Sequence, residues 1–201
     1  MLRLALVTSA SPADEDLRTR LLRVAATMTV ADGWSKMTMS RLADEAGVSR
    51  QSVYNTFGSK PALAQALVMS ELSVFLGKVV DAFEGSGGDP VKAVHDAALG
   101  VLLLSRKSPL LRAAVAGSHG ANSELLPLLT TDNEQLLATA KRVVTDGMLR
   151  FQLPLDRAQL DIGVDVIVRT VLSHVIQPSS TPEKTATGIA WVASAVLHWA
   201  E

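Results

Sequence analysis

The side chains best suited to chemistry gather in one short stretch, GVSRQSVYNTFGSK at residues 47–60. Arginine can form two hydrogen bonds with guanine and glutamine can form two with adenine, so Arg50 and Gln51 could read base edges. The hydroxyl of Tyr54 and the ammonium of Lys60 can donate to phosphate oxygens. Together these residue types point to recognition of a nucleic acid.

Capping residues and helix breaks predict the elements that hold this stretch. Thr38 is placed as the N-cap of a short helix that ends at Gly47. Ser49 is placed as the N-cap of a second helix, over about residues 50–56. Val48 would fill the angle between the two, which gives the spacing of a helix-turn-helix. The second helix of such a motif can lie in the major groove of DNA.

The charge of the chain is unevenly distributed. Its formal net charge is only −1. Residues 17–60 nevertheless hold seven basic and three acidic side chains, a local balance of +4. Residues 61–201 hold 11 basic and 14 acidic side chains, a balance of −3. A basic head on an acidic body indicates that only the head meets a polyanion.

Apolar residues recur at helical spacing along the chain, whereas the period of two that indicates strands is scarce. We therefore predict an all-α fold: an N-terminal three-helix helix-turn-helix domain plus a C-terminal helical bundle, about nine helices in total. The first helix begins at Leu17 and ends near Gly33, which can take the left-handed conformation. Later helices are expected over residues 60–83 (capped by Ser59), 90–105, 109–115, 134–151, 156–176 and 182–200.

Several classes of function lack their motifs in this sequence. Cys is absent, which excludes disulfides, thiolate metal sites and a Cys nucleophile, and fits a reducing cytoplasm. We find no HExxH, no paired His at metal spacing, no phosphate-binding glycine loop and no nucleophile elbow. We predict a cytoplasmic protein that is not an enzyme and has no cofactor or metal. No apolar run is judged long enough to span a membrane; the apolar start MLRLALV leaves secretion as an alternative.

The last two predicted helices are apolar on more than one face, so each needs a partner on both sides. We expect a second subunit to be one of these partners, which makes the protein a homodimer. A helix pair buried wholly within one chain is the alternative. The predicted interface residues are Val164, Ile167, Val171, Val175, Trp191, Val192, Ala195, Val196 and Trp199.

The middle helices are rich in Leu, Val, Ala and Gly and poor in rings, which leaves room for a cavity inside the bundle. We expect an apolar or amphipathic small-molecule effector there. Simple packing without a ligand is the alternative. The candidate contacts are His95, Leu99, Leu103, His119, Met148, Phe151, Arg169 and His174.

The head resembles the DNA-binding domain of the TetR family of transcriptional regulators. The resemblance is strong over about residues 17–68 and rests on the spacing of Thr38, Leu42, Ala43, AGVS at 46–49, Tyr54, Phe57, Lys60 and Leu63. It implies that residues 50–56 occupy the recognition helix, that Tyr54 and Lys60 contact phosphates, and that Phe57 locks this helix to the first one. The DNA-binding residues so assigned are Thr38, Ser40, Arg50, Gln51, Ser52, Tyr54, Asn55, Thr56 and Lys60.

The resemblance also implies a mode of action: a dimer, held by the last two helices, represses transcription at a palindromic operator until an effector releases it. The predicted domains are a flexible lead-in (1–16), a helix-turn-helix domain (17–62) and a ligand-binding and dimerisation domain (63–201). Asn55 and Thr56 depart from the family, which often has ring-bearing residues there. The alternative function is a helical ligand sensor or adaptor whose head docks on protein rather than DNA.

Overall fold

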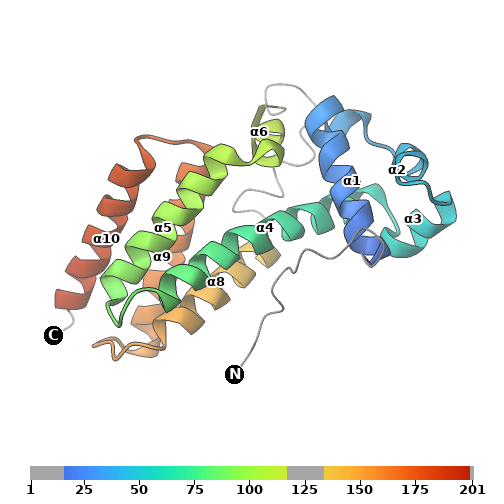
Figure 1. The fold of residues 1–201 in the computed structure, drawn as a ribbon. Helices are drawn as coiled ribbons and strands as arrows, with labels where there is room; N and C mark the ends of the chain where they lie inside the picture. The colour runs from blue at the N-terminus through green and yellow to red at the C-terminus, as the bar shows by residue number, and fades with distance from the viewer. Residues whose placement is uncertain (1–15, 117–133, 200–201) are drawn as a thin grey trace.

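The computed structural model describes residues 16–116 and 134–199. Within these ranges the chain forms nine α-helices, one short 3-10 turn and no strand, which confirms the predicted all-α class (Figure 1). The α-helices are α1 (Leu17–Asp32), α2 (Met39–Ala46), α3 (Arg50–Phe57), α4 (Lys60–Glu84), α5 (Pro90–Lys107), α6 (Pro109–Ala116), α8 (Glu134–Met148), α9 (Arg157–Ile176) and α10 (Pro182–Trp199).

Side-chain caps start the second, third and fourth helices where the sequence places them. The Thr38 hydroxyl accepts a hydrogen bond from the Arg41 amide at 3.1 Å. The Ser49 hydroxyl accepts from the Ser52 amide at 3.0 Å. Ser59 caps α4 in the same way. Each cap satisfies an amide that has no partner inside its helix, so these boundaries follow from local chemistry.

Helix α1 ends beside Gly33 as predicted, but the conformation of this glycine differs from the predicted one. Gly33 has φ 84° and ψ 152°, so its φ is positive but its ψ is extended rather than left-handed helical. Only glycine adopts this conformation readily, and it directs the chain into the turn Trp34–Lys36, which buries the Trp34 ring. The end of α8 also differs from the prediction: the helix stops at Met148, whereas the predicted helix continues to residue 151. The Phe151 amide there donates to the Met148 carbonyl in a tighter turn that brings the Phe151 ring beside Phe83.

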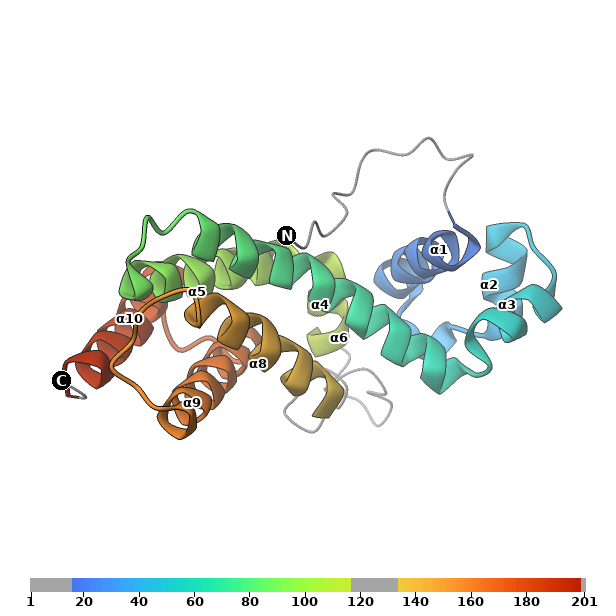
Figure 2. The same cartoon turned by 90° about the horizontal axis from the view of Figure 1, so that it is seen from below.

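The molecule is elongated, with a head of α1, α2 and α3 at one end and α10 at the other (Figures 1 and 2). Helix α4 runs through both parts. Its Leu63 and Leu67 lie in the core of the head, whereas Val79 and Phe83 lie in the core of the body. Helix α6 also packs against α1, so the two parts are joined through α6 as well as through α4. The predicted boundary after residue 62 therefore falls within the first turn of a shared helix.

Helix α4 has a composition that the sequence analysis overlooked. Over its 25 residues it is long and apolar enough to cross a membrane, with a mean hydropathy of 1.5 in its best window. Nine of its side chains are buried, including Leu67, Phe75 and Phe83, and the helix packs against α1, α5 and α8. The buried part of its apolar surface therefore serves packing inside the molecule.

Candidate nucleic-acid interface

The joint between α2 and α3 has the geometry of a helix-turn-helix. Gly47 adopts the left-handed conformation, with φ 67° and ψ 35°, and ends α2. The Val48 amide donates to the Ala43 carbonyl at 3.0 Å, which closes the turn. Leu42 and Val53 are fully buried and hold the two helices together. The motif predicted from the spacing is therefore present.

Helix α3 is attached firmly to α1 through its last residue. Phe57 is buried in the same cluster as Leu21 and Ala25 of α1. The Arg18 guanidinium, also on α1, lies 5.0 Å from the centre of the Phe57 ring, in the range of a cation–π contact. This agrees with the role that the sequence analysis gave to Phe57. A helix of only eight residues would not be stable alone, so these contacts fix it in place.

The outer face of α3 presents four of the predicted DNA-binding side chains to solvent: Arg50, Gln51, Tyr54 and Asn55. The Tyr54 side chain is 47% exposed although it is largely apolar. Gln51 Nε2 donates to Asn55 Oδ1 at 2.7 Å, one helical turn further on. This bond holds the Gln51 amide in one orientation and leaves its carbonyl oxygen and second N–H for other partners.

Two further recognition-helix residues are less accessible. Ser52 and Thr56 are only partly exposed. Thr56 Oγ1 donates to the Ser52 carbonyl at 2.8 Å, so its one hydrogen is used inside the helix. Phosphate oxygens only accept hydrogen bonds, and Thr56 in this rotamer has no hydrogen to give them. The Ser52 hydroxyl lies 2.9 Å from that of Ser49 and stays near the helix start.

The remaining predicted contacts lie at the starts of α2 and α4. Thr38 is exposed and Ser40 is partly exposed. The Thr38 cap uses a lone pair of the hydroxyl, so its hydrogen is not consumed by that bond. Lys60 is the first residue of α4, and its ammonium lies 5.3 Å from the centre of the Trp34 ring. These positions flank α3, where phosphates would lie beside a groove-bound helix.

Arg41 is a positioning residue that the sequence analysis missed. Its guanidinium hydrogen-bonds the Asp32 carboxylate and the Lys36 carbonyl, which ties the first turn of α2 to the end of α1. The hydrogen bond and the charge of Arg41 lower the pKa of Asp32 below its usual range. No local signal could have found this pair, because nine residues and a turn separate the partners.

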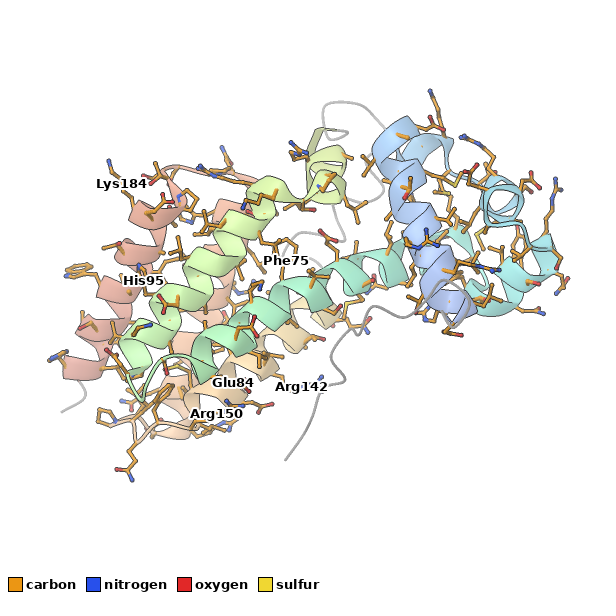
Figure 3. The ribbon with its side chains drawn as sticks, viewed as in Figure 1. Phe75, Glu84, His95, Arg142, Arg150 and Lys184 are labelled. Carbon is orange, nitrogen blue, oxygen red and sulfur yellow. The ribbon has the colours of Figure 1, made fainter. Side chains whose placement is uncertain are left out.

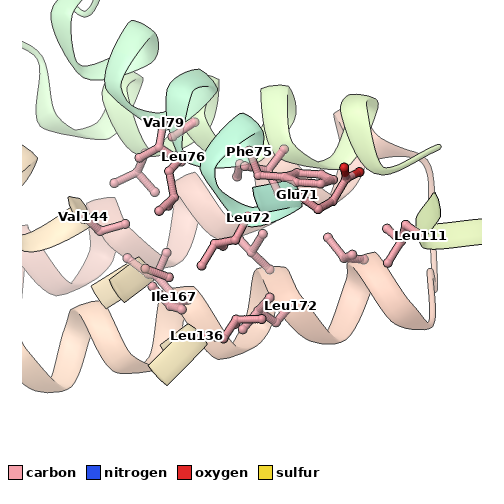
Figure 4. Close-up of a pocket in the computed structure, with 18 of the residues that line it drawn as sticks. Glu71, Leu72, Phe75, Leu76, Val79, Leu111, Leu136, Val144, Ile167 and Leu172 are labelled. Carbon is pink, nitrogen blue, oxygen red and sulfur yellow. The ribbon is translucent and has the colours of Figure 1, made fainter. Parts of the chain in front are cut away.

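The body contains an apolar cavity of about 110 Å³, partly open to solvent, between α4, α5, α8 and α9 (Figure 4). Glu71 is the one ionisable side chain among the lining residues that the structure describes. Its carboxylate accepts a hydrogen bond of 2.5 Å from the Ser108 hydroxyl, between α5 and α6. The lining residues are Val68, Glu71, Leu72, Phe75, Leu76, Val79, Phe83, Val94, Ala97, Ala98, Val101, Leu111, Leu136, Ala140, Val144, Ile167, Val168, Val171, Leu172 and Val175.

None of the predicted ligand contacts that the structure describes lines this cavity, and their role as contacts stays a prediction. His95 hydrogen-bonds Asp96 on α5, away from Phe75 (Figure 3). Arg169 pairs with Asp165, and His174 lines a neighbouring groove rather than the cavity. The others are accounted for as follows: Leu99, Met148 and Phe151 pack in or against the core of the body, Leu103 is exposed, and His119 lies outside the described residues.

The predicted dimer residues fall into three groups. Val164 is 2% exposed and faces the core of its own chain. Ile167, Val171 and Val175 line the cavity. The third group lies on α10 and is placed for contact with another molecule. Trp191 is 72% exposed, and Val192, Ala195 and Val196 are exposed beside it. The side chain of Trp199 lies outside the described residues.

Two exposed apolar residues of α9 were missed as interface candidates. Ile162 is 65% exposed and Val166 is 51% exposed, one helical turn apart. They were overlooked because both faces of α9 are apolar in sequence, and the stripe that was chosen includes Val164, which is buried in its own chain. Periodicity alone cannot distinguish two apolar faces of one helix.

Two family profiles cover most of the chain. The profile of bacterial regulatory proteins of the tetR family matches residues 21–67, and that of a bacterial tetracyclin repressor C-terminal domain matches residues 89–195. The chain belongs to the TetR family. It is therefore a DNA-binding transcriptional regulator and not an enzyme, as the helix-turn-helix spacing predicted.

Known proteins are similar to this TetR family regulator over nearly the whole chain, in sequence and in structure. The HTH-type transcriptional regulator AlkX of Mycobacterium tuberculosis is 26% identical over 174 residues, which cover 87% of this chain and 82% of that protein. The TetR family repressor AlkX from Dietzia sp. is 28% identical with a TM-score of 0.73, over 90% of this chain and 97% of the other. The Rhodococcus erythropolis repressor QsdR shares the fold, with 18% identity, a TM-score of 0.61 and coverage of 90% and 94%.

Proposed function

We propose that this TetR family regulator is a repressor that binds a palindromic operator as a homodimer in the cytoplasm and is released by an apolar or amphipathic effector. The observation that carries the DNA-binding part is the outer face of α3. That face presents Arg50, Gln51 and Tyr54 from a helix that is capped at its start and packed at its end. A rigid helix with exposed polar side chains suits the major groove.

The contacts at this face divide into base readers and phosphate binders. Arg50 is at the first position of α3, so it can reach guanine. Gln51 can pair with adenine through the two groups that its bond to Asn55 leaves available. Tyr54, Thr38 and Lys60 can donate to phosphates on either side. The base readers give preference for a sequence, and the phosphate binders give affinity for any duplex.

The dimer is supported by exposed apolar residues on α9 and α10. Contiguous apolar surface of this kind is uncommon on monomers and marks interaction sites. The small residues Gly188 and Ala195 lie beside Trp191 on α10, so a second helix could approach closely. A two-fold axis through this surface would hold two heads on one side of a duplex and set half-sites about 34 Å apart, or a multiple of that.

Effector control is supported by the connections of the cavity. Leu111 of α6 lines it, and α6 packs against α1 of the head. Helix α4 lines it too and continues into the head. A ligand that favours one arrangement of these helices favours one separation of the two heads, so it can disfavour DNA binding. The aliphatic lining suits an alkyl chain, which agrees with the Dietzia repressor AlkX being implicated in biodegradation of n-alkanes.

Duplex binding at graded salt concentrations tests the first part of the proposal. We expect the affinity to fall steeply between about 50 and 200 mM salt, because bound phosphates release counterions. A head that docks on protein would leave the duplex unbound at every salt concentration, and that result would replace repression with the adaptor function. Release of the duplex as an alkyl ligand is added tests the second part; unchanged duplex affinity at ligand saturation would contradict it.

A further inference from the structure

We propose that the effector is a short alkyl chain with an anionic head group, a carboxylate or a phosphate, whose tail fills the cavity and whose head lies between Arg106 and Arg112. This inference rests on the proposed function, because it takes the cavity as the effector site. It adds the chemical class of the ligand and the place of each end.

The first observation is that the cavity adjoins a groove that also carries basic side chains. Leu111 of α6 and Val175 of α9 line both, so the two spaces lie side by side at these residues. The groove measures about 410 Å³ and is formed by the end of α5, by α6 and by the segment between α9 and α10. An apolar compartment beside a groove with basic side chains suits an amphiphile.

The second observation is the charge of that groove. Arg106, Arg112 and His174 line it. Arg106 donates through Nη2 to the Ser180 carbonyl at 3.2 Å, which holds its guanidinium at the groove wall and leaves other N–H groups. His174 Nδ1 lies 2.8 Å from the Thr170 carbonyl, so Nδ1 carries a hydrogen and Nε2 faces the Ser179 hydroxyl at 3.1 Å. Guanidinium groups pair well with carboxylates and phosphates.

Two carboxylates lie close to this groove, and protein groups already bind both of them. Glu71 accepts from Ser108, as described above. The pKa of Glu183 is lowered by hydrogen bonds from its own backbone amide and from Thr181, and further by the charge of Arg106. Glu71 also lines the cavity itself, where its charge opposes entry of an anionic head. The ligand can therefore enter tail first but not head first.

The size of the cavity limits the tail. An engineered cavity of about 150 Å³ holds the six carbons of benzene, so a cavity of about 110 Å³ holds about four carbons. A chain about two carbons longer could extend from the cavity toward the groove side of Leu111 and Val175. A six-carbon chain such as hexanoate or hexyl phosphate is the expected scale.

Calorimetric titration of the full chain tests the head group and the tail without any variant. The probes are sodium hexanoate, hexyl phosphate, 1-hexanol, hexylamine and sodium acetate. We expect the two six-carbon anions to bind at least about tenfold more tightly than hexylamine or hexanol, and acetate not to bind. The tighter of the two anions identifies the head group as carboxylate or phosphate.

Two arginine variants then locate the head. Arg112→Gln should weaken binding of the better anion about tenfold while leaving hexanol binding unchanged. Arg150→Gln is the matched control: Arg150 is exposed beside Glu84, away from α6 (Figure 3), and should bind the anion as the wild type does.

Three results would overturn the inference. One is that hexanol or hexylamine binds as tightly as the anions. Another is that Arg112→Gln binds the better anion as tightly as Arg150→Gln does. Either result would remove the anionic head site while leaving the cavity as an effector site. The third is that acetate binds as tightly as hexanoate, or that no probe binds at all. In that case the tail has no place in the cavity. Duplex binding measured on the same preparation decides the DNA-binding function separately, whichever result is found.

Discussion

At the scale of single residues, Arg50 carries the most specific prediction. It is exposed at the first position of α3, where a recognition helix meets base edges. Arg50→Ala should cost about 1–3 kcal/mol in operator binding per head and relax the preference at one position of each half-site. Binding assays with single-base operator variants measure both effects. Arg157→Ala removes an exposed arginine of α9 as a control; equal losses in the two variants would show that Arg50 reads no base.

Lys60 should act on every duplex alike. Its ammonium lies at the start of α4, where the amide ends of the helix also favour a phosphate. Lys60→Gln should weaken binding to operator and to random duplex by the same factor. It should also reduce the slope of log affinity against log salt by about one per head. An unchanged slope would mean that Lys60 serves only to cover the Trp34 ring.

Local chemistry predicted the starts of the helices around α3, whereas distant contacts decided how its side chains are held. Thr38, Ser49 and Ser59 could be placed because a cap acts within three residues of itself. The bond from Thr56 to the Ser52 carbonyl could not be foreseen, because a threonine hydroxyl can turn either outward or toward its own helix. The Arg41–Asp32 pair depends on how α1 and α2 meet, which no spacing in the sequence encodes.

At the scale of elements, the contact of α8 with α4 depends on a missing side chain. A Cβ built on Gly147 would lie 2.7 Å from the ring of Phe83, which is too close for two carbon atoms. Because Phe83 is buried and packed beside Phe151, Gly147→Ala should destabilise the protein by about 1–3 kcal/mol. Gly77→Ala, in α4 with open space around it, should instead gain up to about 1 kcal/mol.

Urea unfolding of both variants at one protein concentration measures this difference. If Gly147→Ala were as stable as Gly77→Ala, the close approach of α8 to α4 would be contradicted.

The helices themselves could be predicted well, but the cavity lining could not. Periodicity, caps and proline at the first turn place each helix to within a few residues. The residues chosen as ligand contacts were polar or large, because such side chains look functional in a sequence. The cavity instead collects aliphatic residues such as Ile167 and Val171, which a one-dimensional reading assigned to the subunit interface.

At the scale of the whole molecule, the proposed dimer rests on the outer surface of α9 and α10. Trp191→Glu places a charge in the middle of the proposed interface and should shift the protein from dimer to monomer, because an unpaired charge is costly to bury. Sedimentation analysis over a range of concentrations measures the change. Val74→Glu alters an exposed apolar residue of α4 and should leave the dimer intact; equal behaviour of both variants would remove α10 from the interface.

The proposed repressor function depends on α3 and its two-fold related copy binding in the grooves of one duplex together. Selection of bound sequences from a pool of random duplexes tests this directly, because it needs no knowledge of the operator. We predict a consensus with two inverted half-sites whose centres lie about one helical turn apart, or a multiple of that. Recovery of the pool without enrichment, or of a single unrepeated site, would contradict a dimer that reads DNA through α3.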